Sequence, residues 1–447
     1  MTIWLIRLKI QLRPMDSYFK QCMSPPLALY IIKQITPAQH AVHIIDLNLN
    51  MKLPKEKPDL VGITATVDNT PDACELSRVF RAQGVKTVVG GIHAMANPDY
   101  FIDDFNSVCT GNAELVWAQI LTDAEQDTLK KIYANPRPLE SRDIPVIEAP
   151  PEGKNYLFDN AVTATRGCPF SCDFCYNSSL KRPLVTRNID DVSKEIDKLG
   201  TKHVLFVDDN FIADVSYARR LTERLGAMGV TWGCAVSFNI LRHLDLMDRM
   251  AVCGCKTLFI GFETLNAESL ASMNKKQNNM QKYEKLVEEI HARGMMINAS
   301  IMLGLDEDTK ESIRASIRQL IDWRVDTLTT HILTPYPGTR FYEKMKESGR
   351  IINDDLSKYN TAHVVFQPAR ISKDALYREY LRVYKTFYSW RNIFRRSPSD
   401  NRVRRISYLL FNIIYRKLGK PISAIAYRLG LFHLIGQGAR YLSYKIK

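Results

Sequence analysis

Short apolar runs alternate with segments of helical periodicity along most of this 447-residue chain. In the first stretch, the runs that predict strands cover residues 2–10, 41–47, 60–66, 87–91 and 107–111. Alternating strands and helices form parallel sheets, because a crossover must carry the chain back before the next strand can run parallel to the last. We therefore expect a Rossmann-like, doubly wound domain that binds its ligand at the carboxyl ends of the strands.

The alternation restarts after a proline-containing segment. The predicted strands of this second stretch cover residues 161–166, 203–209, 231–238, 257–263, 295–302 and 327–335. Six repeats predict a partial (β/α)6 barrel, whose chemistry gathers at the carboxyl ends of the strands. Helices without strands are predicted at 372–391, 402–418 and 422–446, with a break at Gly419-Lys420-Pro421. The expected organisation is a first domain at 1–134, a linker at 135–155, the barrel at 156–370 and a basic helical region at 371–447.

Three cysteines follow the first predicted barrel strand in the sequence TRGCPFSCDFCYN. Cys168, Cys172 and Cys175 have the spacing Cys-x3-Cys-x2-Cys, and cysteine thiolates, usually four of them, hold iron–sulfur clusters. Three thiolates on one loop leave one iron of a 4Fe–4S cluster without a protein ligand. Such an open iron can bind a small molecule, as an open zinc site does. We predict these three cysteines as the metal ligands.

The cysteine loop resembles that of the radical S-adenosylmethionine (SAM) superfamily. In that family the open iron binds the amino and carboxylate groups of SAM, and an external donor of the flavodoxin or ferredoxin type reduces the cluster. Three later segments, VDDNF, GFET and INASIMLGL, are similar to the family's SAM-binding patterns in their order along the chain. The SAM-binding residues that the resemblance implies are Phe174, Asp208, Asp209, Glu263 and Gly304.

These implied positions differ in how well they match. VDDNF stands where many members carry a Gly-Gly-Glu turn that binds the amino group, and the two glycines are absent. An acidic pair such as Asp208 and Asp209 can equally be the cap of the next helix. Glu263 matches a contact to the ribose or the carboxylate of SAM. It lies at a strand end, which faces the active-site side of a barrel.

The first domain resembles the cobalamin-binding domain of one branch of the superfamily. Together with the barrel, the similarity covers about residues 24–390. It implies that Thr64 and Thr66, with Gly90 and Gly91, hold the dimethylbenzimidazole tail of cobalamin. The Asp-x-His-x-x-Gly motif of cobalamin mutases is absent, so we expect no protein histidine on the cobalt.

The two resemblances together imply a radical SAM enzyme that uses cobalamin to methylate an unactivated carbon of a lipid or natural-product intermediate. The alternatives are a radical SAM oxidase, cyclase or rearrangement enzyme, with or without cobalamin, and a non-catalytic iron–sulfur electron carrier or sensor. Methylthiotransferases also place a sheet domain before a radical barrel and bind a second cluster through three spread cysteines. Cys22, Cys74 and Cys109 are spread in that way, but their surroundings do not resemble that family.

The end of the chain carries the net charge of the protein. The formal net charge is +13, and residues 385–447 contain 14 Lys and Arg but only one acidic residue. Residues such as Ile406, Leu410 and Ile413 share one helical face, which predicts cationic amphipathic helices too short to span a membrane. We expect a cytoplasmic protein whose tail binds the inner membrane surface peripherally, with packing on the barrel as the alternative. Nucleic acid is not an expected partner, because the tail has no recognised motif.

Overall fold

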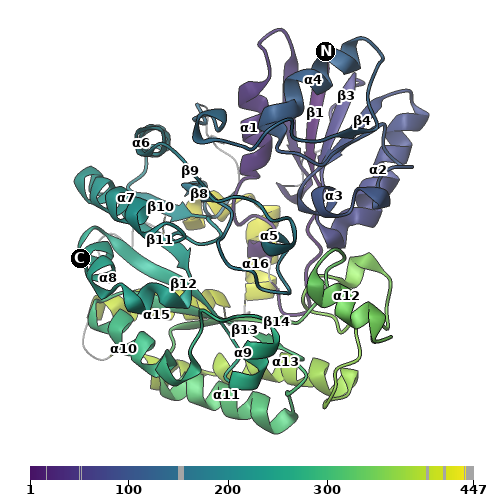
Figure 1. Cartoon of the computed structure of the whole chain (residues 1–447). Coiled ribbons are helices and arrows are strands. Elements are labelled where there is room, and N and C mark those ends of the chain that lie inside the picture. Colours follow the sequence, from purple (N-terminus) through teal and green to yellow (C-terminus); the bar gives the residue numbers. More distant parts are fainter. Residues whose placement is uncertain are drawn as a thin grey trace.

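The computed structural model contains two α/β units, each built on a parallel six-stranded sheet, with further helices at the C-terminal end (Figure 1). The structure describes residues 1–16, 18–49, 51, 53–148, 156–398, 402–415, 419–436 and 438. No helix in these ranges is long and apolar enough to cross a membrane.

The sheet of the first unit has the strand order β2-β1-β3-β4-β5-β6. Its strands are β1 (Thr2–Arg7), β2 (Ala41–Asp46), β3 (Leu60–Thr64), β4 (Lys86–Gly90), β5 (Ser107–Cys109) and β6 (Ile132–Tyr133). Helices α1 (Leu27–Ile35) and α4 (Ala113–Glu125) pack on one face and α2 (Thr70–Ala82) on the other. The doubly wound fold is therefore confirmed. Only β6 was not predicted, because two residues are too few to show a period.

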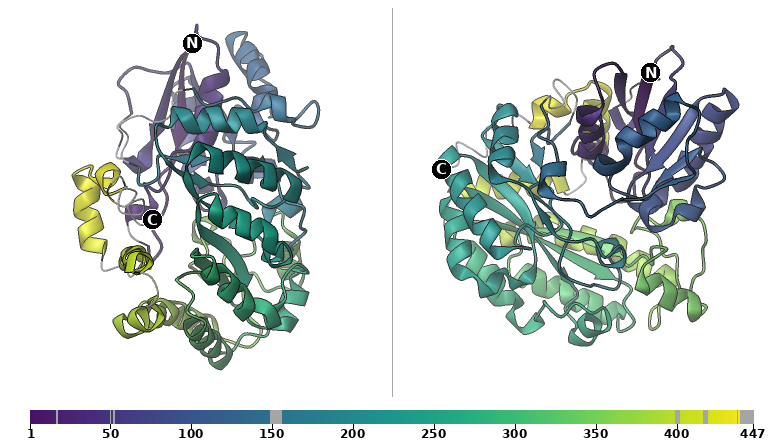
Figure 2. Two further views of the ribbon diagram at one scale, coloured as in Figure 1. Left: turned by 90° about the vertical axis from the view of Figure 1, so that its left-hand side faces the viewer. Right: turned by 45° about the horizontal axis from the view of Figure 1, so that its top comes forward.

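The second unit is a curved, all-parallel sheet with the strand order β14-β13-β12-β11-β10-β7. Its strands are β7 (Ala161–Val162), β10 (His203–Phe206), β11 (Thr231–Val236), β12 (Cys255–Glu263), β13 (Met296–Leu303) and β14 (Thr327–Ile332). Its outer helices are α6 (Ile189–Lys198), α7 (Val215–Met228), α8 (Leu244–Val252), α10 (Tyr283–Ala292) and α11 (Lys310–Asp322). These helices cover the convex side (Figure 2), so the expected partial (β/α)6 barrel is confirmed.

The first barrel strand is split, whereas one strand was predicted over 161–166. After β7, the chain leaves the barrel sheet, and β8 (Thr165–Arg166) pairs antiparallel with β9 (Val185–Thr186). The cause is Asp208, whose carboxylate accepts hydrogen bonds of 2.8 Å from the backbone N–H groups of Ala164 and Thr165. These two N–H groups therefore bond a side chain instead of a neighbouring strand.

The segment between the units is packed, although proline and polar residues predicted a linker. Leu139 and Ile144 form a small buried cluster with Val185, and Ile147 belongs to the core of the first unit. The backbone N–H of Ile147 donates to Glu195 at 3.3 Å. Residues 149–155 of the predicted linker lie outside the described residues.

The helices after the barrel begin with α13 (Lys373–Phe387) and α14 (Trp390–Arg396). Helix α13 covers the open edge of β14, because the hydroxyls of Tyr384 and Tyr388 bond the backbone of Thr330 and Leu328. An uncovered edge strand presents unpaired N–H and C=O groups that can pair with another chain. The two tyrosines therefore terminate the sheet.

The last helices differ from the prediction. Helix α15 (Arg402–Tyr415) was expected, but α16 (Gly419–Arg428) begins where a break was predicted. Pro421 is tolerated there, because a proline in the first turn removes an N–H that has no helical partner. The helix ends before Gly430, which has φ of 68°, so the single helix predicted over 422–446 is wrong. Residues 439–447 of that prediction lie outside the described residues.

Helix α15 packs with a different side from the one predicted. Ile406 and Ile413 are 42% and 44% exposed, whereas Tyr408 and Asn412 are fully buried. The Tyr408 hydroxyl donates to the carbonyl of Ile393, and the Asn412 amide donates to the barrel. Ile406 and Ile413 of the predicted face therefore stay exposed, because hydrogen bonds, which hydrophobic periodicity does not detect, fix the other side.

Candidate functional site

The three predicted cluster cysteines lie on the loop between β8 and the short helix α5 (Tyr176–Ser179), at the carboxyl end of the barrel. The loop begins at Gly167, whose φ is 88° and where a Cβ would come within 2.7 Å of the carbonyl oxygen of Pro183. Only glycine fits this approach. The hydroxyl of Ser178 donates to the carbonyls of Cys172 and Cys175 and fixes the far end of the loop.

The three thiols of this loop are the side chains that would hold a 4Fe–4S cluster. Among the described residues, no three His, Cys, Asp or Glu side chains converge as ligands of one metal ion. In such a cluster each thiolate would hold its own iron. Burial, with smaller contributions from neighbouring thiols, raises the pKa of Cys168 and Cys175. A cluster would reverse this shift, since a metal deprotonates the thiols that bind it.

Glu263 and Lys275 form a buried ion pair beside the cysteines. Glu263 ends β12 with φ of 64°, an uncommon backbone conformation for a residue with a side chain. Burial lowers the pKa of Lys275, but the charges of Glu263 and Cys172 outweigh burial, so this pKa is raised. The ammonium also lies 5.7 Å from the centre of the Phe174 ring. Lys275 thus joins three predicted site residues, and sequence reasoning missed it because it belongs to none of the family motifs.

Phe174 lies against the end of β13. It packs in a cluster with Met302, Leu305 and Phe341. Next to it, Gly304 has φ of 98°, and its N–H donates to Asp308 at 2.8 Å. The structure therefore brings together Phe174 and the loop after β13, two positions for which the family resemblance implies contacts to SAM.

Asp208 and Asp209 follow β10 and hold the start of the cysteine loop. Asp208 is 4% exposed, and burial raises its pKa to about 7. One of its oxygens bonds the split first strand, and Oδ2 has no hydrogen-bond partner. Asp209 accepts from the N–H of Gly167 at 3.3 Å. Neither residue caps a helix, because Asp214 is the N-cap of α7.

The first unit has a cavity of about 400 Å³ at the carboxyl ends of β1, β3, β4 and β5. Thr64, Gly90 and Gly91 line it, as predicted. Gly91 has φ of 103°, and a Cβ there would lie 2.6 Å from the carbonyl oxygen of Ala65. Thr66 is not part of the lining, because its N–H donates to Asn69 and its hydroxyl to Asp68 within the turn η3 (Val67–Asn69).

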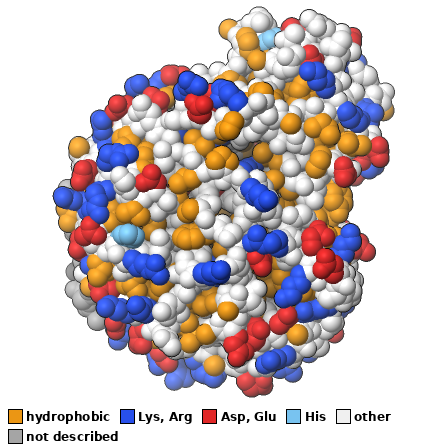
Figure 3. Space-filling view, viewed as in Figure 1, with side chains coloured by type: hydrophobic (Ala, Val, Ile, Leu, Met, Phe, Trp, Pro, Cys, Tyr) orange, Lys and Arg blue, Asp and Glu red, His pale blue; other side chains and the backbone are white. Residues whose placement is uncertain are grey.

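This cavity faces the barrel. Thr163, Arg166 and Arg182 of the second unit contribute to its wall, and Arg166 pairs with Glu114 of the first unit at 2.6 Å. The rest of the wall is mainly apolar, and no described histidine is part of it. A largely apolar cavity with a few polar groups is typical of a cofactor site. Figure 3 shows the hollow where the two units meet, on the same face as Figure 1.

The cavity suits the tail of cobalamin. Gly90 and Gly91 line it with backbone alone, and Thr64 supplies a hydroxyl that can bond a ring nitrogen. The second cluster of methylthiotransferases is not supported by the three spread cysteines. Cys22, Cys74 and Cys109 belong to three separate buried clusters.

Comparison with known proteins identifies the barrel. Residues 162–320 match the model of the radical SAM superfamily. The chain thus contains a radical SAM domain. It is 28% identical over 412 residues to a bacteriochlorophyllide d C-12(1)-methyltransferase of Chlorobaculum tepidum, covering 89% of this chain and 90% of that one. It is 24% identical to a hopanoid C-2 methylase of Rhodopseudomonas palustris, covering 80% and 71% of the two chains.

The fold of the whole radical SAM chain also has a counterpart among solved structures. The methyltransferase TsrM of Kitasatospora setae, solved with cobalamin and a [4Fe–4S] cluster, superimposes with a TM-score of 0.67 at 15% identity. The match covers 96% of this chain and 99% of that one. Both units and the helices after them therefore belong to one shared architecture.

Proposed function

We propose that this protein is a cobalamin-dependent radical SAM methyltransferase, which methylates an unactivated carbon of a lipid or natural-product intermediate. The observation that carries the proposal is the cavity of the first unit, which has a glycine floor and a wall completed by Arg166 and Arg182 of the barrel. A cofactor in this cavity lies beside the segment that leads into the cysteine loop. Transfer between two cofactors needs this proximity.

The residues assigned to this function form three binding sites, for the cluster, for SAM and for cobalamin. When bound, the cluster supplies the electron that cleaves SAM, and cobalamin supplies the methyl group. The cluster is assigned to Cys168, Cys172 and Cys175, SAM to Phe174, Asp208, Asp209, Glu263 and Gly304, and cobalamin to Thr64, Gly90 and Gly91. Lys275 is an addition to the SAM site, where it orients the carboxylate of Glu263. An external flavodoxin or ferredoxin would reduce the cluster.

The substrate class rests on the relatives. Two that cover most of their own length are methyltransferases of bacteriochlorophyllide d, and others are hopanoid methylases. A tetrapyrrole or a polycyclic lipid is therefore the favoured substrate. The second candidate function is cyclisation. A magnesium-protoporphyrin IX monomethyl ester cyclase of Cereibacter sphaeroides is 23% identical and matches 77% of this chain.

The test is anaerobic reconstitution of the protein with iron, sulfide and cobalamin, followed by reduction in the presence of SAM. We expect bound cobalamin in a ratio of about one per chain, and 5′-deoxyadenosine as a product. With substrate and SAM carrying a labelled methyl group, the label should appear on the substrate. A cyclase would instead release an unlabelled product, and an electron carrier would leave SAM intact.

The tail supports a peripheral membrane role within the same proposal. Phe394, Ile425, Leu429 and Leu434 are between 58% and 65% exposed, and basic residues surround them in the sequence. The helices that carry them lie along one side of the molecule (Figure 2). An apolar surface within a cationic segment is typical of binding at the interface of an anionic membrane. Such binding would bring the enzyme to a substrate that partitions into lipid.

A further inference from the structure

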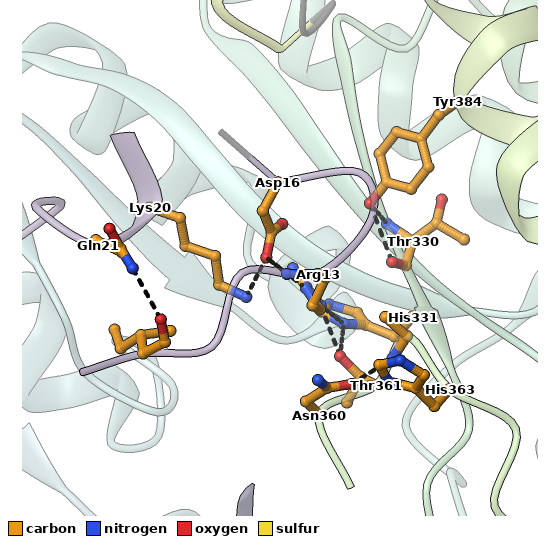
Figure 4. Close-up of polar contacts among 12 residues, drawn as sticks. Arg13, Asp16, Lys20, Gln21, Thr330, His331, Asn360, Thr361, His363 and Tyr384 are labelled. Carbon is orange, nitrogen blue, oxygen red and sulfur yellow. Dashed lines mark hydrogen bonds and ion pairs between the residues drawn. The ribbon is translucent and has the colours of Figure 1, made fainter. Parts of the chain in front are cut away.

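The segment that follows β1 leaves the first unit and reaches the last strand of the barrel. It carries Arg13, Asp16 and Lys20, which we name the Arg13 cluster (Figure 4). Nε of Arg13 and Nζ of Lys20 each lie 2.9 Å from the same oxygen, Oδ2 of Asp16. Because one carboxylate faces two cations, the cluster carries one excess positive charge.

Arg13 and Asp16 have a structural use. Nη1 of Arg13 donates to the Thr361 hydroxyl at 2.6 Å and lies 3.4 Å from Nδ1 of His331, the last residue but one of β14. Burial, together with the charges of Arg13 and Lys20, lowers the pKa of His331 to about 3, so that this ring stays neutral beside two cations. Thr361 has φ of 63° and needs such support. The Arg13–Asp16 pair thus fastens the segment to the barrel.

Lys20 has no comparable structural use. Its ammonium has three donors, and its one hydrogen bond within the described residues is the one to Asp16. Its side chain is 31% exposed. Burial and the charge of Arg13 lower its pKa, although Asp16 opposes them. Beside it, Oε1 of Gln21 is buried and has no hydrogen-bond partner. Lys20 is thus a half-buried cation whose charged form is disfavoured by its surroundings, and such a group is typical of a binding site.

The position of the Arg13 cluster suits contact with the substrate. A cavity of about 310 Å³, lined by Arg13, Asp16, Tyr18 and His363 among others, adjoins the cluster. The charge of Asp68, in the turn η3 that follows β3 of the first unit, also acts on Lys20 and raises its pKa. The cluster therefore borders the space between the carboxyl ends of both sheets. Within the barrel it contacts His331 of β14.

Tyr336 lies between the Arg13 cluster and the cysteine loop. Burial and the charge of Asp68 raise the pKa of Tyr336 and the charge of Arg13 lowers it, and the ring stacks on that of Tyr176 with 5.4 Å between the ring centres. Tyr176 directly follows Cys175, a predicted cluster ligand. These rings belong to a packed cluster, with Val67 and Ile92 of the first unit, that joins the two units next to the cysteine loop.

We propose that Lys20, supported by Arg13, binds a carboxylate of the substrate. The inference rests on the proposed function and narrows its substrate class to a molecule that carries an acid group, rather than a neutral hydrocarbon lipid. A second carboxylate would balance the two cations of the cluster and occupy the free donors of the Lys20 ammonium. Charge-assisted hydrogen bonds of this kind are about twice as strong as neutral ones.

The experiment compares two probes on the reconstituted holoprotein, bacteriochlorophyllide d and its carboxyl methyl ester. Binding is followed by the fluorescence of the tetrapyrrole. We expect the acid to bind about tenfold more tightly than the ester, a difference that one charge-assisted bond supplies. In Lys20→Met and Lys20→Gln the acid should lose this advantage, whereas Lys20→Arg should keep most of it. Lys285→Met is the matched control, because Lys285 is exposed on the outer helix α10.

Two results would overturn the inference. One is equal binding of acid and ester by the wild-type protein, and the other is an undiminished preference for the acid in both neutral Lys20 variants. Cleavage of SAM without substrate is measured on the same samples and separates this inference from the proposed function. Wild-type cleavage with equal binding would contradict the carboxylate site alone, whereas absent cleavage would contradict the enzyme. The thermal midpoints of the Lys20 variants should match that of the wild type, because Arg13 and Asp16 keep their contacts.

Discussion

The cysteine loop and the cavity of the first unit show two ways of building a cofactor site. The loop places all three ligands within eight residues, and its shape depends on local bonds such as those of Ser178. The cavity has no comparable motif, because residues from four strands, three helices and the other unit form its wall. A covalent ligand set is thus compact in sequence, whereas a surface that binds by shape is distributed. The two sites should therefore fail differently when single residues are changed.

The largest effect is expected at the cysteine loop. Cys172→Ala should lose the cluster, which holds about four irons per chain, and SAM cleavage should fall below detection, because each thiolate holds one iron. Iron content and 5′-deoxyadenosine are the measurements. Cys253→Ala is the control, since Cys253 lies outside the loop and is partly exposed. A Cys168/Cys172/Cys175 triple alanine variant that still cleaves SAM would refute the cluster assignment.

The cavity should lose cobalamin binding when a side chain replaces a glycine in its wall. In Gly91→Val the side chain would collide with the backbone of Ala65, so cobalamin binding should fall by at least about a hundredfold while iron content stays unchanged. The absorbance of bound cobalamin after gel filtration measures the loss. Gly84→Ala is the control, because Gly84 also has positive φ, at 70°, but no backbone atom lies close to its Cβ position. Equal cobalamin content in both variants would place the cofactor elsewhere.

The Glu263–Lys275 pair joins the cysteine loop to the proposed SAM site. A change in this pair should therefore affect the affinity for SAM more than the assembly of the cluster. Glu263→Gln should weaken SAM binding about tenfold, the usual effect of removing one charged hydrogen-bond partner. Equilibrium dialysis with labelled SAM measures it, and iron content should not change. Glu268→Gln on the nearby exposed surface is the control. Loss of iron in Glu263→Gln would make the pair a support of the loop instead.

The cobalt should have no protein nitrogen ligand. His93, the histidine nearest in sequence to Gly91, is fully buried, and its Nδ1 is 3.0 Å from the Tyr176 hydroxyl. Electron paramagnetic resonance of the Co(II) form should therefore lack nitrogen superhyperfine splitting from a histidine. Labelling the histidines with 15N is the check. A splitting that changes with the label would contradict the prediction and turn attention to His93.

The smallest effect is expected for the tail. Binding to anionic liposomes should weaken as salt rises, because exposed charges are screened over about 8 Å at physiological ionic strength. The double variant Phe394→Ser and Leu434→Ser should bind several-fold less at constant salt, since each removes exposed apolar area. Val252→Ser is the matched control, as Val252 is 84% exposed on the barrel helix α8. Equal binding to neutral liposomes would exclude the electrostatic contribution.

The sequence by itself determined the order of strands and helices, the two α/β units and the three cysteines. Strands β3 and β13 are apolar because both faces are covered, and Cys168, Cys172 and Cys175 form one local pattern. Periodicity and short motifs record such information directly, because they depend on neighbours along the chain. The family resemblance added predicted roles for Gly91 and Glu263.

Only the tertiary structure decided which distant groups meet. Lys275 reaches Glu263, Arg13 reaches Thr361, and Thr66 turns away from the cavity that Thr64 lines. The split of the first barrel strand and the buried side of α15 have the same origin in hydrogen bonds to distant backbone, which the Asp208 carboxylate accepts and the Asn412 amide donates. A buried polar group must find a partner, and which partner is within reach depends on packing rather than on sequence spacing.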